Sequence, residues 1–280
     1  MRDKTVVITG ATSGIGEVAA DRLAQKGARI VFVARDHERG QATLKHLRAI
    51  AGHDEHAVHY ADLSLLSEQK RVAEEIAAQE SHIDVLINNA GAIFTTRQVT
   101  ADGLEKTFAL NHLSYFTITN VLLDRLKATP GARVVNTASD AHKGRRIDFS
   151  DLQSEKHYSG FAVYGRSKLM NILFTRELAR RLAGTGVTAN CLHPGFVATH
   201  FGDQSGGLLS WGIRWAKNFA LTPEQGAQTI IYLASSPEVE GKTGGYYYRC
   251  KLAQPTREAQ NDADAKRLWD ESAKIAGLGF

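Results

Sequence analysis

The segment Thr9-Gly10-Ala11-Thr12-Ser13-Gly14-Ile15-Gly16 follows the apolar run Val6-Val7-Ile8 and precedes a stretch of residues with helical period. Its glycines allow a tight turn and a close approach to a ligand, and the free N–H groups and dipole at a helix start attract a phosphate. The spacing is G-x-x-x-G-x-G, and a turn without a ligand would have similar glycines. Its place after the first strand favours a site for the pyrophosphate of a dinucleotide. The residues expected to bind it are Gly10, Thr12, Ser13, Gly14, Ile15 and Gly16.

Short apolar runs alternate with longer segments of helical period along most of the chain. The runs are apolar at consecutive positions, which is typical of strands that are buried on both faces. The alternation predicts an α/β fold, in which a doubly wound parallel sheet of about seven strands carries helices on both faces. The expected strands are Val6–Ile8, Ile30–Val33, Val58–Tyr60, Val85–Ile87, Val134–Val135, Val187–Ala189 and Tyr246–Tyr248, and the expected helices are 14–26, 37–51, 65–80, 102–127, 161–184 and 223–236.

The chain is predicted to form a single domain over residues 1–280, because no proline-rich linker, repeat or low-complexity tract divides it. Two stretches do not fit the alternation of strands and helices. They are predicted to be an insertion at about 197–222 and a C-terminal extension at about 255–280.

The composition is that of a soluble globular protein. Hydrophobic residues make up 43% and charged residues 23% of the chain, which excludes a disordered, collagen-like or coiled-coil protein. The 34 Lys and Arg against 30 Asp and Glu give a net charge of +4, which is too even and too scattered for a nucleic-acid surface. The histidines His53, His56 and His59 lie close together, but no cysteine or carboxylate set completes a metal site, and no metal is expected.

The sequence is expected to belong to a cytoplasmic protein without a membrane span. A strand-like run begins at Thr5, which leaves no room for a signal peptide. The longest uncharged stretch, Leu182–Gly202, contains glycines and a proline that rule out a lipid-exposed helix. Two cysteines, Cys191 and Cys250, cannot build a disulfide framework, which favours a reducing compartment.

Further motifs follow the glycine-rich turn in order along the chain. They are Asn88-Asn89-Ala90-Gly91 after the fourth expected strand, Asn111 within an expected helix, Ser139 after the fifth strand, Tyr164-Gly165-Arg166-Ser167-Lys168 at the start of a long helix, and Pro194-Gly195 after the sixth strand. Together these motifs resemble the short-chain dehydrogenase/reductase family, and the resemblance extends from about Lys4 to Tyr248. It implies a Rossmann sheet with the strand order 3-2-1-4-5-6-7 and an NADP(H)-dependent conversion between an alcohol and a carbonyl compound.

Within this family the chain is similar to the retinol-dehydrogenase-like branch at Asn111-His112-Leu113, Asn171–Leu178 and Leu268-Trp269. Membrane members of that branch carry an N-terminal hydrophobic segment, whereas this chain starts at its first strand, which makes a retinoid a less expected substrate. The family also implies a homodimer or homotetramer, formed through the helices expected at 102–127 and 161–184.

Four residues are expected to carry the chemistry. Tyr164 and Lys168 are four residues apart, so they lie on one face of a helix. An ammonium held close and the positive charge of an oxidised nicotinamide favour the phenolate, which predicts a lowered pKa for Tyr164 and a role as general acid and base. Ser139 is expected to hydrogen-bond the same substrate oxygen. The resemblance implies that Lys168 also holds the nicotinamide ribose and that Asn111 supports a water that relays protons.

The resemblance also implies further contacts with the cofactor. Asp62 follows the third expected strand, where the family places an acid on the adenine amino group, although capping a turn would also explain it. Gly91 permits a close approach of the adenosine half, and Thr199 matches the position that hydrogen-bonds the carboxamide. The complete set beyond the glycine-rich turn is Arg35, Asp62, Leu63, Asn89, Ala90, Gly91, Tyr164, Lys168, Pro194, Gly195, Val197 and Thr199.

The residues after the second expected strand predict a preference for NADP(H) over NAD(H). Members that prefer NAD have an acid at the end of this strand, and Ala34 stands there in this chain, followed by Arg35. A guanidinium can pair with the 2′-phosphate of NADP, and Arg39 lies one helical turn further on. Arg35 would alternatively cap the strand end or pair with Asp36.

The predicted insertion at 197–222 is expected to contact the substrate. Leu208, Trp211, Trp215 and Phe219 recur at spacings of three, four and four, which gives a helix one apolar aromatic face. Such a face would close over a lipophilic carbonyl compound, or would instead pack on the core or on a second subunit. The expected substrate contacts are His142, Phe201, Trp211 and Trp215.

The sequence therefore predicts an NADP(H)-dependent oxidoreductase that acts on a small, lipophilic alcohol or carbonyl compound. The alternative is a non-catalytic dinucleotide sensor on the same fold. A sensor would be expected to have lost Tyr164 or Lys168, and both are present.

Overall fold

The computed structural model describes residues 1–51, 55–196 and 221–279, and a single sheet organises them. Its strand order is β3-β2-β1-β4-β5-β6-β7-β8, and all pairs are parallel except the last. The α/β fold and the predicted order of the first seven strands are confirmed. The strands are β1 Thr5–Thr9, β2 Arg29–Ala34, β3 Ala57–Tyr60, β4 Val85–Asn88, β5 Arg133–Thr137, β6 Thr188–His193, β7 Tyr246–Tyr248 and β8 Lys251–Ala253.

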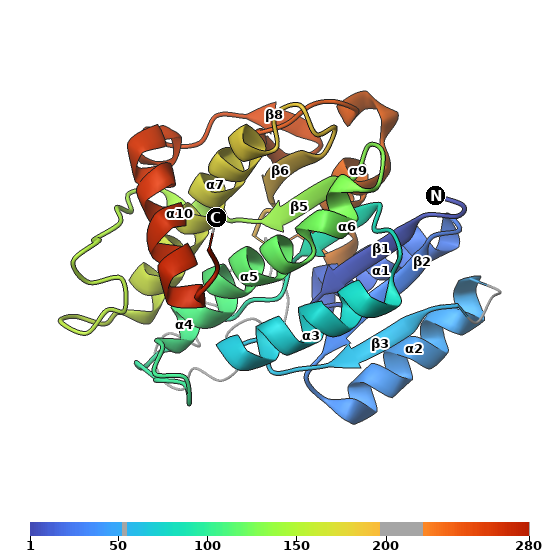
Figure 1. The fold of residues 1–280 in the computed structure, drawn as a ribbon, viewed down its shortest axis with the longest axis horizontal. Helices are drawn as coiled ribbons and strands as arrows, with labels where there is room; N and C mark the ends of the chain where they lie inside the picture. Colours follow the sequence, from blue (N-terminus) through green and yellow to red (C-terminus); the bar gives the residue numbers. More distant parts are fainter. Residues whose placement is uncertain (52–54, 197–220, 280) are drawn as a thin grey trace.

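Helices cover both faces of the sheet (Figure 1). The buried side chains of α1, α2 and α9 belong to the core on one face, and those of α3, α5 and α7 belong to the core on the other. Along β1, Val6 and Ile8 point into the first core and Val7 into the second, which explains the uninterrupted apolar run in the sequence. These helices are α1 Gly14–Gln25, α2 His37–Ala51, α3 Leu66–Gln79, α5 Ser114–Val121, α7 Gly160–Arg181 and α9 Pro223–Ser235.

The eighth strand was not predicted. Arg249 and Cys250 both adopt positive φ, 48° and 60°, and the two residues turn the chain so that β8 pairs antiparallel with β7. Asn-Gly or Asp-Gly is the usual signal for such a two-residue turn, and the pair Arg-Cys lacks it. The hairpin is therefore decided by pairing with β7 rather than by local sequence.

The helix expected at 102–127 is interrupted. It consists of α4 Lys106–Phe108, the π-helical turn η1 Ala109–Leu113, α5 and α6 Leu123–Lys127. Single π-turns inside α-helices are frequent at functional sites, and this one carries Asn111.

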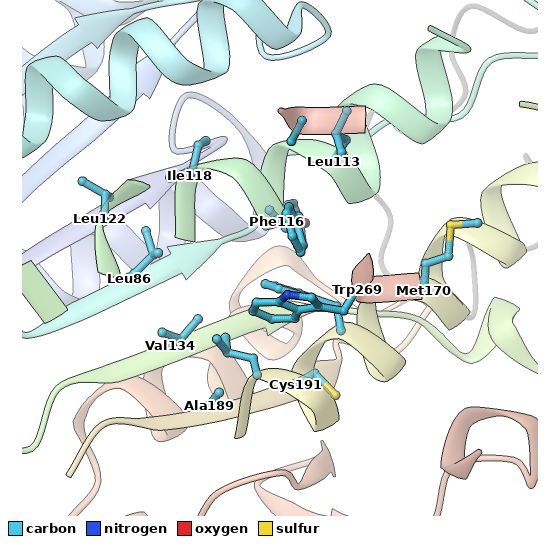
Figure 2. Close-up of a cluster of buried hydrophobic side chains, with 14 of the residues drawn as sticks. Leu86, Leu113, Phe116, Ile118, Leu122, Val134, Met170, Ala189, Cys191 and Trp269 are labelled. Atoms are coloured by element: carbon cyan, nitrogen blue, oxygen red, sulfur yellow. The ribbon is translucent and has the colours of Figure 1, made fainter. Parts of the chain in front are cut away.

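The C-terminal extension contains the helix α10 Asp262–Ala276, which packs on α7. Its Trp269 is buried against Phe116 of α5 and Phe174 of α7, with ring centroids at 5.0 and 5.8 Å (Figure 2). Helix α10 therefore covers part of the surface of α5 and α7 through which the family resemblance implies a homodimer or homotetramer. An assembly through those helices would have to form around α10.

Residues 197–220 lie outside the described residues, and with them the predicted contacts of Val197, Thr199, Phe201, Trp211 and Trp215. Within the described ranges, no helix has the length and apolar character needed to cross a bilayer.

Candidate active site

The candidate site is built at the carboxyl ends of β1, β4, β5 and β6. Asn89, just after β4, ties that strand to the glycine-rich turn, because its Nδ2 donates to the carbonyl oxygen of Gly10 at 3.2 Å. The hydroxyl oxygen of Thr9 accepts from the backbone N–H groups of Asn89 and Ala90 at 3.0 and 3.1 Å. A Cβ on Gly16 would lie 2.1 Å from the Gly10 carbonyl oxygen, so only glycine fits there. These contacts hold the turn close to the end of β4.

The start of α1 suits the phosphate groups of a dinucleotide. Gly10 and Gly14 adopt positive φ, 72° and 60°, which glycine allows without strain. The N-cap residue Ser13 is extended and exposed, and its side chain makes no capping hydrogen bond to the helix. The first N–H groups of α1 thus lack the usual side-chain acceptor, and an anion can take its place.

The structure brings Ser139, Tyr164 and Lys168 together. Ser139 follows β5 and hydrogen-bonds the side chain of Tyr164 on the first turns of α7. Lys168, one turn further along α7, is only 2% exposed, and its Nζ donates to the carbonyl oxygen of Thr137 at 3.0 Å. The same Nζ lies 5.6 Å from the ring centroids of both Tyr164 and Tyr115, within reach of a cation–π interaction.

Burial dominates the electrostatics of this cluster. Burial raises the pKa of Tyr164 to about 12, although the hydrogen bond with Ser139 acts in the opposite direction. Burial lowers the pKa of Lys168 to about 7, because its ammonium group is taken out of water. The predicted lowering of the Tyr164 pKa depends on the positive charge of an oxidised nicotinamide, and it stays a prediction.

Asn111 connects the π-turn to the segment after β4. Its Nδ2 donates to the Ala92 carbonyl oxygen and its Oδ1 accepts from the Ala92 N–H, both at 2.9 Å. Its backbone carbonyl accepts from the Nδ2 of Asn171 at 2.9 Å. A Cβ on Gly91 would lie 3.3 Å from Asn111 Oδ1 and 3.5 Å from Lys168 Nζ, so Gly91, Asn111 and Lys168 are neighbours. The role of Asn111 in supporting a water stays a prediction.

The remaining cofactor residues lie at the same edge of the sheet. Asp62 follows β3, and its Oδ1 accepts from both the N–H and the hydroxyl of Ser64, at 2.9 and 2.8 Å. The turn-capping role that the sequence left open is thus real, and the adenine contact stays a prediction. Leu63 is buried beside it. Pro194 and Gly195 follow β6, with Gly195 at a φ of 90°.

His142 is not placed as a substrate contact would require. Its ring is fully buried, with Nδ1 at 2.6 Å from the Ser139 carbonyl oxygen and Nε2 accepting from the Thr256 N–H at 3.3 Å. Both ring nitrogens are therefore used by the backbone. The ring instead joins the turn after β5 to the C-terminal extension.

Arg35 and Arg39 are exposed beside the glycine-rich turn. The Nη2 of Arg39 donates to the carbonyl oxygen of Thr12 at 3.1 Å. The carboxylate of Asp36 accepts from the Arg39 N–H at 2.8 Å and so caps the start of α2. Asp36 is thus engaged by the helix rather than by Arg35, and two guanidinium groups stand where a 2′-phosphate is predicted.

Sequence reasoning did not single out Thr9, Tyr115, Asn171 or His193 as parts of this site. Each is buried and polar, and each contacts a predicted site residue or its backbone. The only sign of these residues in the sequence is a polar residue inside an apolar strand or helix. That sign does not show which site residue the polar side chain contacts.

Acid is expected to destabilise the protein through His112 of the π-turn. Its buried Nε2 hydrogen-bonds Ser272 of α10 at 2.9 Å, and burial lowers its pKa to about 4. The unfolded chain takes up this proton near pH 6.5 and the folded chain only near pH 4. The free energy of unfolding should therefore fall as the pH decreases through that window, by about 3 kcal/mol.

Urea unfolding from pH 7 to pH 4 measures this loss. The variant His112→Phe lacks the titrating group, so its stability should fall less steeply with decreasing pH than that of the wild type. Parallel pH dependences for the two proteins would contradict the assignment.

Comparison with known proteins identifies the family. A family model described as short chain dehydrogenase matches residues 4–206. The chain is 42% identical to retinol dehydrogenase 14 of Homo sapiens over an alignment of 300 residues, which covers 99% of this chain and 88% of that protein. It is 41% identical to retinol dehydrogenase 11 of Homo sapiens over 276 residues, with coverage of 98% and 86%.

Solved structures support this assignment to the short chain dehydrogenase family. An uncharacterised protein from Mycobacterium Paratuberculosis superimposes with a TM-score of 0.79 at 32% identity and covers 100% of this chain and 95% of its own. A short chain dehydrogenase from Burkholderia cenocepacia J2315, solved in complex with NADP, has a TM-score of 0.70 at 25% identity, with coverage of 88% and 95%. The chain therefore belongs to the short-chain dehydrogenase family, in its retinol-dehydrogenase-like branch, and is an oxidoreductase of the kind that interconverts alcohols and carbonyl compounds.

Proposed function

We propose that this chain is an NADP(H)-dependent reductase/dehydrogenase that interconverts a lipophilic carbonyl compound and its alcohol, with Tyr164 as general acid and base. The observation that carries the proposal is the cluster of Ser139, Tyr164 and Lys168 beside the glycine-rich turn. This edge of the sheet, at the carboxyl ends of its parallel strands, is where open α/β sheets bind their ligands.

The residues of the cluster have separate tasks in this proposal. When bound, the nicotinamide supplies or accepts the hydride. Tyr164 donates a proton to the carbonyl oxygen during reduction, and burial, which raises its pKa to about 12, keeps the phenol protonated for this step. During oxidation the phenolate takes the proton of the alcohol, and the Lys168 ammonium together with the positive charge of an oxidised nicotinamide would favour that form. The Ser139 hydroxyl donates a hydrogen bond to the same oxygen. Lys168 holds the nicotinamide ribose, and Asn111 supports a water that relays protons.

The preference for NADP(H) rests on Arg35 and Arg39. Both are exposed, Arg35 directly after β2 and Arg39 in the first turn of α2, and Arg39 already donates to the carbonyl oxygen of Thr12 in the glycine-rich turn. Charge-assisted, bidentate hydrogen bonds to a phosphate are stronger than neutral ones, so a 2′-phosphate would be held here and a free 2′-hydroxyl would gain little.

A lipophilic substrate is supported by the relatives, several of which are named retinol dehydrogenases, after a long apolar alcohol. The aromatic residues Trp211 and Trp215 also favour it, although they lie outside the described residues. The proposed location is the cytoplasm, which agrees with free thiols at Cys191 and Cys250. A homodimer or homotetramer stays a prediction.

A panel of aldehydes of increasing chain length, with the matching alcohols, tests the proposal. Each is assayed with NADPH or NADP⁺ and with NADH or NAD⁺, by the absorbance of the reduced cofactor. We expect turnover with NADPH and NADP⁺. We also expect kcat/KM to rise with chain length, with a gain in transition-state stabilisation of up to roughly 0.8 kcal/mol per buried methylene. A flat length dependence would indicate small polar carbonyl substrates, and NADPH binding without turnover of any compound would favour the sensor.

A further inference from the structure

His193 stands at the carboxyl end of β6, between the turn that follows β5 and the turn that follows β6. Its side chain is buried, with the residue only 8% exposed. The ring stacks on Tyr248 of β7, with centroids 4.8 Å apart and an angle of 22° between the ring planes. The ring therefore has a fixed orientation within the edge of the sheet that carries the candidate site.

One ring nitrogen of His193 joins the two turns. Its Nδ1 accepts from the backbone N–H of Asp140 at 3.3 Å and from the backbone N–H of Gly195 at 3.2 Å. Asp140 directly follows Ser139, and Gly195 belongs to the Pro194-Gly195 turn that is predicted to contact the cofactor. Because an imidazole nitrogen that accepts carries no proton, the neutral ring has its proton on Nε2.

The Nε2 side of the ring faces the carboxylate of Asp140, with Nε2 at 3.6 Å from Oδ2. That carboxylate also accepts from Lys143 Nζ at 2.7 Å and from the hydroxyl of Tyr246 at 3.0 Å. His142 lies on the same turn and acts electrostatically on His193. Among the residues that the structure describes, the ionisable groups around the ring are Asp140, His142, Lys143, Tyr246 and the stacked Tyr248.

We propose that His193 is a positioning residue for the proposed reaction, which holds the turn of Ser139 and the turn of Gly195 at a fixed separation through the two hydrogen bonds to its unprotonated Nδ1. This rests on the proposed function, because the two turns matter together only if one holds the substrate oxygen and the other the cofactor.

A proton on Nδ1 would replace the acceptor with a donor that faces two N–H groups. Both hydrogen bonds would be lost, and the two turns would be free to move apart. Burial lowers the pKa of His193, and the Asp140 carboxylate only partly opposes this. The neutral ring therefore persists below the ordinary histidine pKa of about 6.5, and kcat/KM should decrease as the pH falls through the lowered value.

Two substitutions distinguish the role of the Nδ1 acceptor of His193 from the role of its aromatic ring. His193→Phe keeps an aromatic ring to stack on Tyr248 but has no acceptor, whereas His193→Asn offers an amide oxygen near the position of Nδ1 that does not titrate. We expect His193→Phe to lower kcat about ten- to a hundredfold, the scale of a displacement of about 1 Å between reacting groups. His193→Asn should keep kcat within about threefold of the wild type and should lose the acid limb of the pH profile.

Three results would overturn the proposal. The first is a folded His193→Phe variant with wild-type kcat, and the second is an equal loss in the Asn and Phe variants. The third is an unchanged acid limb in His193→Asn, which would assign that limb to His142.

Amide hydrogen exchange of Asp140 and Gly195, measured by NMR without cofactor, provides a readout that is independent of activity.

Protection of both amides should fall in His193→Phe and at acid pH in the wild type, but should persist at acid pH in His193→Asn. If the wild type turns over no substrate, the proposed function fails. The exchange data would then show separately whether His193 holds the two turns.

Discussion

Replacing Tyr164 with phenylalanine is expected to lower kcat for carbonyl reduction by at least about a hundredfold, the usual scale for the loss of a positioned general acid. The substitution removes only the hydroxyl that hydrogen-bonds Ser139 and keeps the ring that lies 5.6 Å from Lys168 Nζ. The fold and the affinity for NADPH should therefore be nearly unchanged. Steady-state kinetics together with a fluorescence titration of NADPH would measure both effects.

Tyr232→Phe is the matched control, because Tyr232 lies on α9 and its hydroxyl donates to the exposed Glu238 in the turn after that helix, away from the cluster. It should have wild-type turnover. If Tyr164→Phe keeps near-wild-type kcat while the control also does, Tyr164 is not the proton donor and the mechanism is wrong.

The second large effect is expected from Arg35→Ala. Loss of a charge-assisted hydrogen bond worth roughly 1.5–3 kcal/mol should raise the Kd of NADPH about ten- to a hundredfold. The Kd of NADH should change little, because NADH has no 2′-phosphate for the guanidinium to contact. Titration of the two reduced cofactors by protein fluorescence compares the two affinities directly.

Arg22→Ala controls for the change in net charge, since Arg22 lies in the last turn of α1, at the other end of that helix from the glycine-rich turn. It should leave both affinities unchanged. Equal affinity of the wild type for NADPH and NADH would remove the basis of the preference, and an equal loss for both cofactors in Arg35→Ala would assign Arg35 a structural role.

Much of the fold could be predicted because its signals are local. Runs such as Val6-Val7-Ile8 are apolar at consecutive positions, which is typical of strands buried on both faces. The tight glycine-rich turn is likewise a local feature that the sequence predicts, and the structure adds the reason for Gly16, because a Cβ there would meet the Gly10 carbonyl oxygen. The order of the motifs placed Ser139, Tyr164 and Lys168 at one edge of the sheet, since the carboxyl ends of parallel strands meet there.

Other features depend on partners that are far away in the sequence. Helix α10 is amphipathic by itself, but its place on α7 follows from the fit of Trp269 between Phe116 and Phe174. The hairpin of β7 and β8 and the π-turn at Asn111 lack the local residues that usually signal them. Neither could be read from sequence, because pairing and packing with the rest of the chain stabilise them.

The chain by itself thus determined which residues follow the strands and lie at their carboxyl ends, because the alternation of strands and helices and the glycines of the turns are short-range patterns. The order of the strands was implied by the family resemblance. Only the tertiary structure decided what those residues do to one another. In the structure, His142 is buried and accepts from the Thr256 N–H, and His193 accepts from the N–H groups of Asp140 and Gly195. Burial in the folded chain also raises the pKa of Tyr164, because desolvation depends on every element packed around a side chain.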